Sequence, residues 1–332
     1  MGRPDRHNRG WWGSDKAVGS PRLQPPAVRG LPGKEQAAAV EFWFTEKPTP
    51  NWGMTYRVQQ VLRRRQTAYQ DLAVVETVEF GRALILDGIV QLTEKDEFVY
   101  HEMIVHVPMC AHPDPRRVLV VGGGDGGAVR EILRHPAVEE ICLVDIDGEV
   151  IEAAREFFPR VSSGLDDPRV HIVIEDASRY LWRDEVQGRY DVILVDSPDP
   201  VGPAIALFQE DFYRAVYRAL APDGLFSAQS ECPFLMPDFI RSVQESAARV
   251  FPIVKLYIYS NVTYPGGMWA FTTGSKRYDP ACPQEGRRPA GPTRYWTPEV
   301  HRAAFVLPPF VQELAPRQHA LPGTCAGTVD RV

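Results

Sequence analysis

Apolar residues recur along the middle of the chain in two alternating patterns. Short apolar runs that read as strands occupy residues 118–121, 141–145, 170–174, 191–196, 225–228, 253–259 and 268–273. Between the second and third runs, the apolar positions recur at the spacing of one buried helix face, at Val150, Ile151, Ala154, Phe157 and Phe158. Strands that alternate with helices form βαβ units and a mostly parallel sheet. The pattern therefore predicts an α/β domain, which we place at residues 96–280.

The residues before this domain favour strands alone. Residues 72–78 are apolar and β-branched, and residues 82–88 read as a strand that ends in an Asp-Gly turn. An apolar helix pattern then begins near Phe98 and runs towards Pro108. We therefore expect a small β-rich N-terminal domain over residues 39–95.

Both ends of the chain differ in composition from its middle. Residues 1–38 are rich in Gly, Pro and Arg, with seven Lys and Arg against three Asp and Glu. Such a segment buries too little apolar surface to offset the entropy lost on ordering, so we expect a disordered basic extension. A tail that binds nucleic acid or a partner is the alternative. Residues 281–332 are rich in Pro and Arg, and we expect them to be partly disordered apart from a short helix near 310–314.

Composition narrows the class of protein. The 332 residues are 44% hydrophobic and carry a net charge of −6, which argues against a nucleic-acid binder and suits a cationic substrate. No run of about 18 apolar residues is present, so we expect no membrane span. The five cysteines are scattered and form no CxxC pair, so we expect no disulfide framework, no metal site and a cytoplasmic location.

The segment 121–127 carries the first chemical signal. Gly122, Gly124 and Gly127 fit the spacing GxGxxG after a strand and before a helix, where the bare backbone and the helix N-terminus can hold a ligand. Asp145 ends the next strand about 20 residues further on, where an acid can accept the ribose hydroxyls. A nucleoside site is therefore favoured over a tight turn with a solvated acid, although dinucleotide dehydrogenases share this fingerprint.

The acids at the strand ends distinguish between these nucleoside ligands. Asp125, Asp145, Asp176 and Asp196 follow four consecutive strands, and open parallel sheets bind their ligands at that edge. A pyrophosphate would be repelled by Asp125, whereas a sulfonium or an ammonium would be attracted. The acids therefore favour an adenosyl-sulfonium donor over a hydride-transfer cofactor.

Three further residues are ambiguous by themselves. Asp199 lies three residues after Asp196 in a Pro-rich loop, which could cover the site as a lid or could be an exposed Asx-turn. Tyr264 lies in a Tyr-Pro-Gly-Gly turn that could wall the site or simply connect a hairpin. His101, on the helix that begins near Phe98, could be a packed histidine rather than a ligand.

Several segments between about residues 41 and 315 resemble the spermidine synthase family, and closely its bacterial members. They read YQDL at 69–72, FGR at 80–82, LDG at 86–88, TEKDEFVYHEM at 93–103, VGGGDGG at 121–127, DSPDPVGP at 196–203, TYPGG at 263–267 and AAFVLP at 303–308. The resemblance implies a Rossmann-like, methyltransferase-type domain after the small β-rich domain. It also implies an enzyme of polyamine biosynthesis, an aminopropyltransferase that forms a homodimer or a homotetramer.

The resemblance implies roles for individual residues as well. The adenosine part of the donor is held by the positions that match Gln70, Asp145, Asp176, Ala177 and Pro203, and we add Gly122 and Gly124 of the glycine segment to this group. Asp125 matches the acid beside the aminopropyl chain, and Asp196 matches the proton acceptor. The diamine pocket is lined by the positions that match Tyr100, His101, Asp199 and Tyr264.

The reaction that the resemblance implies transfers the aminopropyl group of decarboxylated S-adenosylmethionine, a co-substrate rather than a cofactor, to putrescine. It gives spermidine and 5′-methylthioadenosine by in-line displacement, with Asp196 as the general base. The alternatives are another acceptor (cadaverine, agmatine or spermidine), an S-adenosylmethionine methyltransferase and a non-catalytic polyamine-binding protein. Asp125 argues against the methyltransferase, whose donor carries a carboxylate.

Two residues depart from the family pattern. Ala177 stands where glycine is common, so a methyl group must fit beside the adenine. Pro198 stands where threonine is common, which removes a hydroxyl and a backbone donor from the catalytic loop. The resemblance therefore leaves the adenine contacts and the behaviour of the lid open.

Overall fold

The computed structural model describes residues 40–198, 207–315 and 318. From Glu41 onward the described residues belong to one unit. The predicted disorder of residues 1–38 lies outside the described residues, as do the site residues Asp199 and Pro203.

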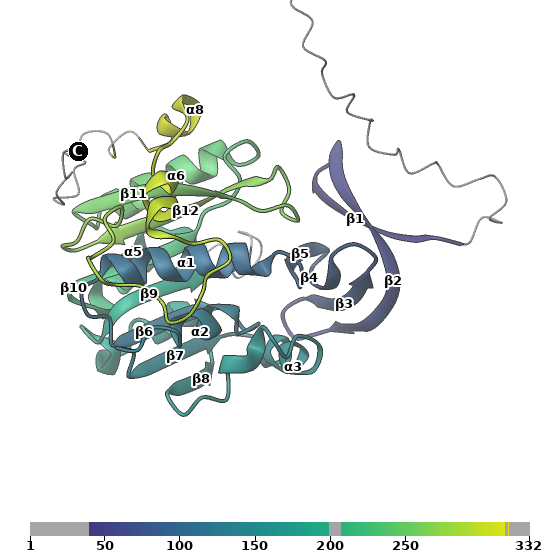
Figure 1. The fold of residues 1–332 in the computed structure, drawn as a ribbon, viewed down its shortest axis with the longest axis horizontal. Coiled ribbons are helices and arrows are strands. Elements are labelled where there is room, and N and C mark those ends of the chain that lie inside the picture. Colours follow the sequence, from purple (N-terminus) through teal and green to yellow (C-terminus); the bar gives the residue numbers. More distant parts are fainter. Residues whose placement is uncertain (1–39, 199–206, 316–317, 319–332) are drawn as a thin grey trace, which may run out of the picture. The chain divides into compact units, whose positions relative to one another are not determined.

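The first five strands form an antiparallel sheet in sequence order (Figure 1). They are β1 (Phe42–Thr49), β2 (Trp52–Gln66), β3 (Asp71–Thr77), β4 (Gly81–Leu86) and β5 (Ile89–Thr93). Apolar residues on one face of this sheet, such as Leu72 and Leu84, pack against Val150 and Ala153 of the helix α3 (Gly148–Phe157). The predicted β-rich N-terminal fold is confirmed, and α3 connects it to the residues that follow.

The remaining strands form a seven-stranded sheet in the order β11-β12-β10-β9-β6-β7-β8. They are β6 (Arg117–Gly122), β7 (Glu140–Asp145), β8 (Val170–Ile174), β9 (Tyr190–Asp196), β10 (Leu220–Gln229), β11 (Ile253–Ser260) and β12 (Met268–Ser275). β12 pairs antiparallel with both of its neighbours, whereas the pairings among β8, β7, β6, β9 and β10 are parallel. This order confirms the Rossmann-like, methyltransferase-type sheet.

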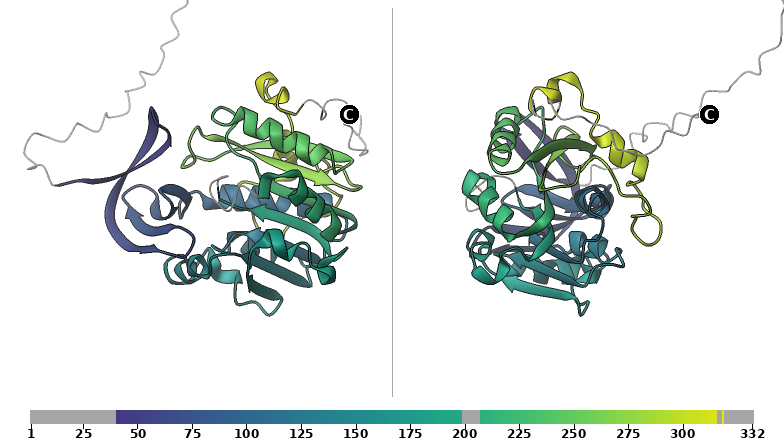
Figure 2. Two further views of the ribbon diagram at one scale, coloured as in Figure 1. Left: turned by 180° about the vertical axis from the view of Figure 1, so that it is seen from behind. Right: turned by 90° about the vertical axis from the view of Figure 1, so that its left-hand side faces the viewer.

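Helices cover both faces of the large sheet (Figure 2). They are α1 (Glu97–Ala111), α2 (Gly127–Ile132), α4 (Ala177–Tyr180), α5 (Glu210–Ala219), α6 (Pro237–Ala248), α7 (Pro298–Ala304) and α8 (Pro309–Gln312). Because side chains alternate along a strand, Val120 of β6 packs in one cluster with α1 and α2. Its neighbour Val121 packs in the other cluster, with α5 and α6. The two apolar clusters hold the strand ends of β6 and β9 in place.

α1 is longer than its sequence pattern suggested. It continues past Pro108 to Ala111, because a proline removes only one backbone donor and nearly every residue of the helix is buried. Cys110, Cys142 and Cys232 are free thiols, but Cys282 is disulfide-bonded, which the scattered cysteines did not lead us to expect. Among the described helices, none is both long and apolar enough to cross a membrane.

The chain changes direction across the large sheet between β6 and β9. From β6 it builds the sheet outward through β7 and β8, and it then returns to place β9 on the other side of β6. At this point Gly122, the last residue of β6, pairs with Asp196, the last residue of β9. Open α/β sheets bind ligands in the crevice that such a reversal creates at the carboxyl ends of the strands.

Candidate functional site

A cavity of about 180 Å³ lies at the carboxyl ends of β6, β7 and β9, and residues of β4 and β5 close its other side. The predicted site residues that line it are Gln70, Tyr100, His101, Gly122, Gly124, Asp125, Asp145, Asp176, Ala177, Asp196 and Tyr264. Pro198 lines it as well. Asp199 and Pro203 lie outside the described residues. The structure thus brings the described site residues together around one cavity.

The glycine segment is packed against the protein's own acids. Gly122 has φ +75°, and a Cβ there would lie 2.2 Å from the carbonyl oxygen of Asp196. A Cβ on Gly124 would lie 2.7 Å from Oδ2 of Asp145, to which the Gly124 N–H donates a hydrogen bond of 3.0 Å. Because Gly122 and Gly124 have no side chains, Asp196 and Asp145 at the strand ends can lie directly against the backbone of this segment.

Gly127, the third glycine of the motif, makes room for a histidine. A Cβ at this position would lie 2.2 Å from Cε1 of His101 and within 2.5 Å of both ring nitrogens. No residue with a side chain could occupy position 127 without displacing the imidazole. The motif spacing is thus explained here by an internal contact.

A second group of polar residues links the small sheet to the end of β7. Asp147 is buried and accepts hydrogen bonds from Thr67 Oγ1 at 2.8 Å and Gln70 Nε2 at 2.9 Å. The Asp147 N–H donates in turn to Asp145 Oδ1 at 2.9 Å. Burial raises the pKa of Asp145 to about 6, although the N–H groups of Asp147 and Gly124 stabilise its charge. Gln70, in the turn between β2 and β3, and Asp145, at the end of β7, are therefore held at the same end of the cavity.

Asp176 and Ala177 lie at the start of α4. The Asp176 carboxylate caps this helix, because Oδ1 accepts hydrogen bonds from Ser178 N at 2.8 Å and Ser178 Oγ at 2.7 Å. The Ala177 methyl group is buried in the apolar cluster that includes α5 and α6. The departure from glycine therefore fits the packing of this chain.

Asp196 lies at the centre of the cavity wall. Its Oδ1 accepts a hydrogen bond of 2.6 Å from Tyr100 Oη, and its buried Oδ2 has no hydrogen-bond partner among the described residues. Burial and the nearby Asp125 carboxylate raise the pKa of Asp196 to about 7, although His101 and Tyr100 oppose the shift. A carboxyl group with this pKa can both accept and release a proton near neutral pH.

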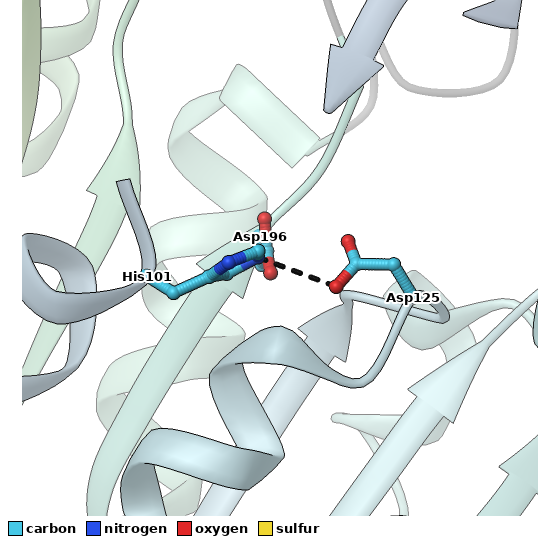
Figure 3. A group of neighbouring side chains, drawn as sticks. All are labelled: His101, Asp125 and Asp196. Atoms are coloured by element: carbon cyan, nitrogen blue, oxygen red, sulfur yellow. Dashed lines mark ion pairs between the residues drawn. The ribbon is translucent and has the colours of Figure 1, made fainter. Parts of the chain in front are cut away.

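His101, Asp125 and Asp196 come from α1, the glycine segment and β9, respectively, and face one another (Figure 3). His101 Nε2 lies 3.3 Å from Asp125 Oδ1, which also accepts a hydrogen bond of 2.7 Å from Gly127 N. Burial opposes a charge on Asp125, but His101 and the Gly127 N–H outweigh it, so the pKa of Asp125 is lowered. Asp125 is therefore held in its anionic form, and its charge raises the pKa of the neighbouring Asp196.

The ligand atoms of His101, Asp125 and Asp196 lie within 4.8 Å of one another, which is close enough to surround a metal ion. The two ring nitrogens of His101 already face carboxylates, Glu97 at 2.6 Å and Asp125 at 3.3 Å. A metal ion could bind the imidazole only by displacing one of these contacts. We therefore assign no metal to this group.

Tyr264 forms part of the opposite wall and is anchored in the small sheet. Its hydroxyl donates to the carbonyl of Gln91 at 2.6 Å, and its ring lies 5.9 Å from that of Tyr100 in an edge-on contact. The preceding residue, Thr263, donates through N and Oγ1 to the buried Asp96 at the start of α1. The turn is therefore a rigid part of the wall rather than a loose connection.

Sequence reasoning missed several residues that line the cavity, namely Glu46, Gln91, Gln229 and Trp269. Glu46 is a buried acid in the middle of β1 and accepts a hydrogen bond from the Val90 N–H at 3.3 Å. A single acid among the polar residues of a strand gives no signal of its own. Only the pairing of β1 with the rest of the small sheet brings it to the cavity.

The strand order and the cavity define a Rossmann-like protein with an acidic cavity at the point where the sheet reverses. Comparison with protein families extends this result. Residues 97–284 match the model of the spermine/spermidine synthase domain, and residues 42–94 match that of the spermidine synthase tetramerisation domain. The chain belongs to the spermine/spermidine synthase family, and it is an enzyme of the aminopropyltransferase class.

Relatives of known class align with more than four fifths of this chain. The polyamine aminopropyltransferase of Moorella thermoacetica is 52% identical over 82% of this chain and 95% of its own length. That of Bacillus subtilis is 51% identical over 82% of this chain and 99% of its own. Two solved structures are similar, namely a spermidine synthase in complex with the transition-state analogue AdoDATO and the spermidine synthase of Thermotoga maritima. The first has a TM-score of 0.80 at 42% identity over 83% of this chain and 95% of that chain. The second has a TM-score of 0.79 at 41% identity over 83% and 94%.

Proposed function

We propose that this enzyme transfers the aminopropyl group of decarboxylated S-adenosylmethionine to putrescine, giving spermidine and 5′-methylthioadenosine. The observation that carries the proposal is the buried Asp196, whose pKa lies near neutrality at the point where β6 and β9 diverge. Both substrates are cations, and the cavity around Asp196 is lined by further acids. The similarity to a spermidine synthase that binds a transition-state analogue supports the same reaction.

The adenosine part of the donor would occupy the end of the cavity nearest β7. Asp145 would accept the ribose hydroxyls, and Gln70 would contribute its amide oxygen, since its Nε2 is held by Asp147. The backbone at Asp176 and Ala177, together with Pro203, would contact the adenine. The ammonium of the aminopropyl chain would then lie against Asp125, which favours the decarboxylated donor because a carboxylate would be repelled.

The diamine would occupy the part of the cavity between Tyr100, His101 and Tyr264, with Asp199 binding its distal ammonium. One nitrogen must lose a proton before it can attack, and its ordinary pKa is about 10.4 if it resembles lysine. Asp196 would take that proton through its unpaired Oδ2. The nitrogen lone pair then forms a bond to the aminopropyl carbon while the carbon–sulfur bond breaks, and sulfur keeps the electron pair as the neutral thioether of 5′-methylthioadenosine.

The same proposal includes domain boundaries at residues 39–95 and 96–280 and assembly as a homodimer or a homotetramer. It also includes a cytoplasmic location and a reaction that uses no metal and no nucleic-acid partner. The match of residues 42–94 to a tetramerisation domain supports the oligomer.

The proposal is tested by incubating the purified enzyme with decarboxylated S-adenosylmethionine and, in separate reactions, putrescine, cadaverine, agmatine and spermidine. We expect stoichiometric 5′-methylthioadenosine and polyamine, with the highest kcat/KM for putrescine. A higher kcat/KM for another amine would make that amine the preferred acceptor and would leave the proposed aminopropyl transfer unchanged. No product with any amine would contradict the proposed function, and methyl transfer from S-adenosylmethionine would assign the alternative class.

A further inference from the structure

His101 is enclosed by two carboxylates on opposite sides of its ring. Nδ1 lies 2.6 Å from Glu97 Oε2, one helical turn earlier on α1, and Nε2 lies 3.3 Å from Asp125 Oδ1. The ring is only 2% exposed and packs against Gly127, so it cannot turn away from either acid. A carboxylate accepts hydrogen bonds, so a proton on Nδ1 satisfies the contact with Glu97, and a positive charge on the ring stabilises the ion pair with Asp125.

Glu97 is held in its ionised form by an arginine behind it. Arg130 of α2 donates two hydrogen bonds to the two Glu97 oxygens, at 3.0 and 2.9 Å. Burial opposes the charge on Glu97, but His101 and Arg130 outweigh it, so the pKa of Glu97 is lowered. Arg130 is oriented in turn by a hydrogen bond of 2.9 Å to Glu131. Starting at the cavity, negative and positive side chains therefore alternate in the order Asp125, His101, Glu97, Arg130 and Glu131.

We propose that Glu97 is a positioning residue that, fixed by Arg130, keeps a proton on both nitrogens of His101 and so makes His101 a permanent cation between Asp125 and Asp196. The inference rests on the proposed function for its consequence in catalysis. It gives His101 a role different from that of a proton acceptor or a direct ligand of the cationic diamine. An imidazolium has no lone pair to offer to an ammonium.

The role of this cation follows from the groups that face it. Those groups are Glu97 and Tyr100 from α1, Asp125 from the glycine segment and Asp196 from β9. Burial opposes a charge on His101, but Asp125 and Glu97 outweigh it and raise the pKa of His101 to about 10. Since His101 lowers the pKa of Asp196 while Asp125 raises it, a neutral imidazole would leave Asp196 protonated up to a higher pH.

The first test measures the protonation of His101 directly in the unliganded enzyme. In NMR spectra of ¹⁵N-labelled protein, we expect imidazolium nitrogen shifts and two slowly exchanging ring protons for His101 from pH 6 to pH 8. His101→Gln identifies the signals. A neutral imidazole in the native enzyme at pH 7 would overturn the proposal. This readout does not depend on activity, so it remains decisive if no aminopropyl transfer is found and the proposed function fails.

The second test compares two matched substitutions on α1. Glu97→Gln keeps the shape of the side chain and removes its charge, so His101 should titrate below pH 8 and the acidic limb of kcat/KM for the diamine should move up by about one pH unit. Glu102→Gln is the control, because Glu102 is also buried, accepts hydrogen bonds from the N–H groups of residues 294–296, and forms no hydrogen bond or ion pair with the described His101 side chain. An unchanged profile in Glu97→Gln, or an equal shift in both variants, would refute the positioning role.

Discussion

Among single residues, Asp196 shows how its surroundings can change the chemistry of an ordinary carboxyl group. An exposed aspartate has a pKa of about 3.9 and would be a poor base towards an amine. Burial and the charge of Asp125 bring the pKa of Asp196 to about 7, and the hydrogen bond from Tyr100 fixes its orientation. In the proposed reaction, the remaining oxygen, Oδ2, takes the proton that arrives with the amine.

We expect Asp196→Asn to lower kcat by about 10²- to 10⁴-fold, because the amide cannot accept the proton of the attacking amine. In the native enzyme, kcat/KM should rise with pH through about 7 as Asp196 loses its proton, and the variant should lose this rise. Steady-state kinetics from pH 5.5 to 9 measure both effects. Calorimetry should show nearly unchanged binding of 5′-methylthioadenosine, and a variant with native turnover would exclude Asp196 as the base.

At the scale of elements, α1 and the glycine segment form one assembly. α1 supplies Tyr100 and His101 in succession, and the ring of His101 occupies the space that a side chain at Gly127 would need. The glycine motif could be recognised from its spacing, but the reason for its third glycine could not, because His101 lies 26 positions earlier in the sequence. The contact depends on how α1 packs across α2.

We expect Gly127→Ala to displace the His101 ring and lower kcat/KM by at least about 10²-fold, since a shift of about 1 Å in an active site can cost that much. Gly148→Ala is the control, because a Cβ there would meet Ile174 at an ordinary distance of 3.6 Å. Its activity should remain within about twofold of native, and circular dichroism should show that both variants are folded. Equal activity of the two variants would contradict the proposed contact.

The strands of the large sheet could be predicted from the sequence more accurately than the helices. Each predicted strand lies within an observed one, as 118–121 does within β6, because a continuous apolar run is typical of a strand buried on both faces. β1 and β2 gave a weaker signal, since most of their residues are exposed and polar. α1 was predicted to run only towards Pro108, because a proline inside a helix is usually a boundary.

At the scale of the whole described molecule, Asp147 joins the small sheet to the large one. Its carboxylate accepts hydrogen bonds from Thr67 and Gln70 near the small sheet and from the N–H of Glu149 at the start of α3. It is 2% exposed, and its removal would leave the buried Thr67 hydroxyl and two half-buried donors without this acceptor. The cavity between the sheets therefore depends on this residue.

We expect Asp147→Ala to lower the free energy of unfolding by about 2–4 kcal/mol, because buried donors would lose their acceptor and α3 would lose its cap. Asp166→Ala is a suitable control, since Asp166 is 84% exposed and forms a surface ion pair with Arg155. Its effect should be at most about 1 kcal/mol. Urea denaturation followed by circular dichroism measures both values, and a loss no larger than that of the control would disprove the joining role.

How much of the site could be predicted also depends on distance along the chain. Asp125, Asp145 and Asp196 could be placed at one edge, because parallel strands end on the same side of a sheet. Glu46, Glu97 and Arg130 gave no comparable signal. Arg130 approaches Glu97 from another helix, 33 positions away, and a salt bridge of this kind follows from packing rather than from any local pattern.

The acids that pack against the glycine segment also influence which molecules can compete for this cavity inside a cell. The abundant adenosine compounds of metabolism carry phosphate groups, and a phosphate beside this segment would face Asp125, Asp145 and Asp196 without a lysine or arginine among the cavity-lining residues described. ATP and the dinucleotides should therefore bind weakly despite sharing the adenosine part of the donor. The proposed sulfonium donor would then meet little competition from nucleotides for this cavity.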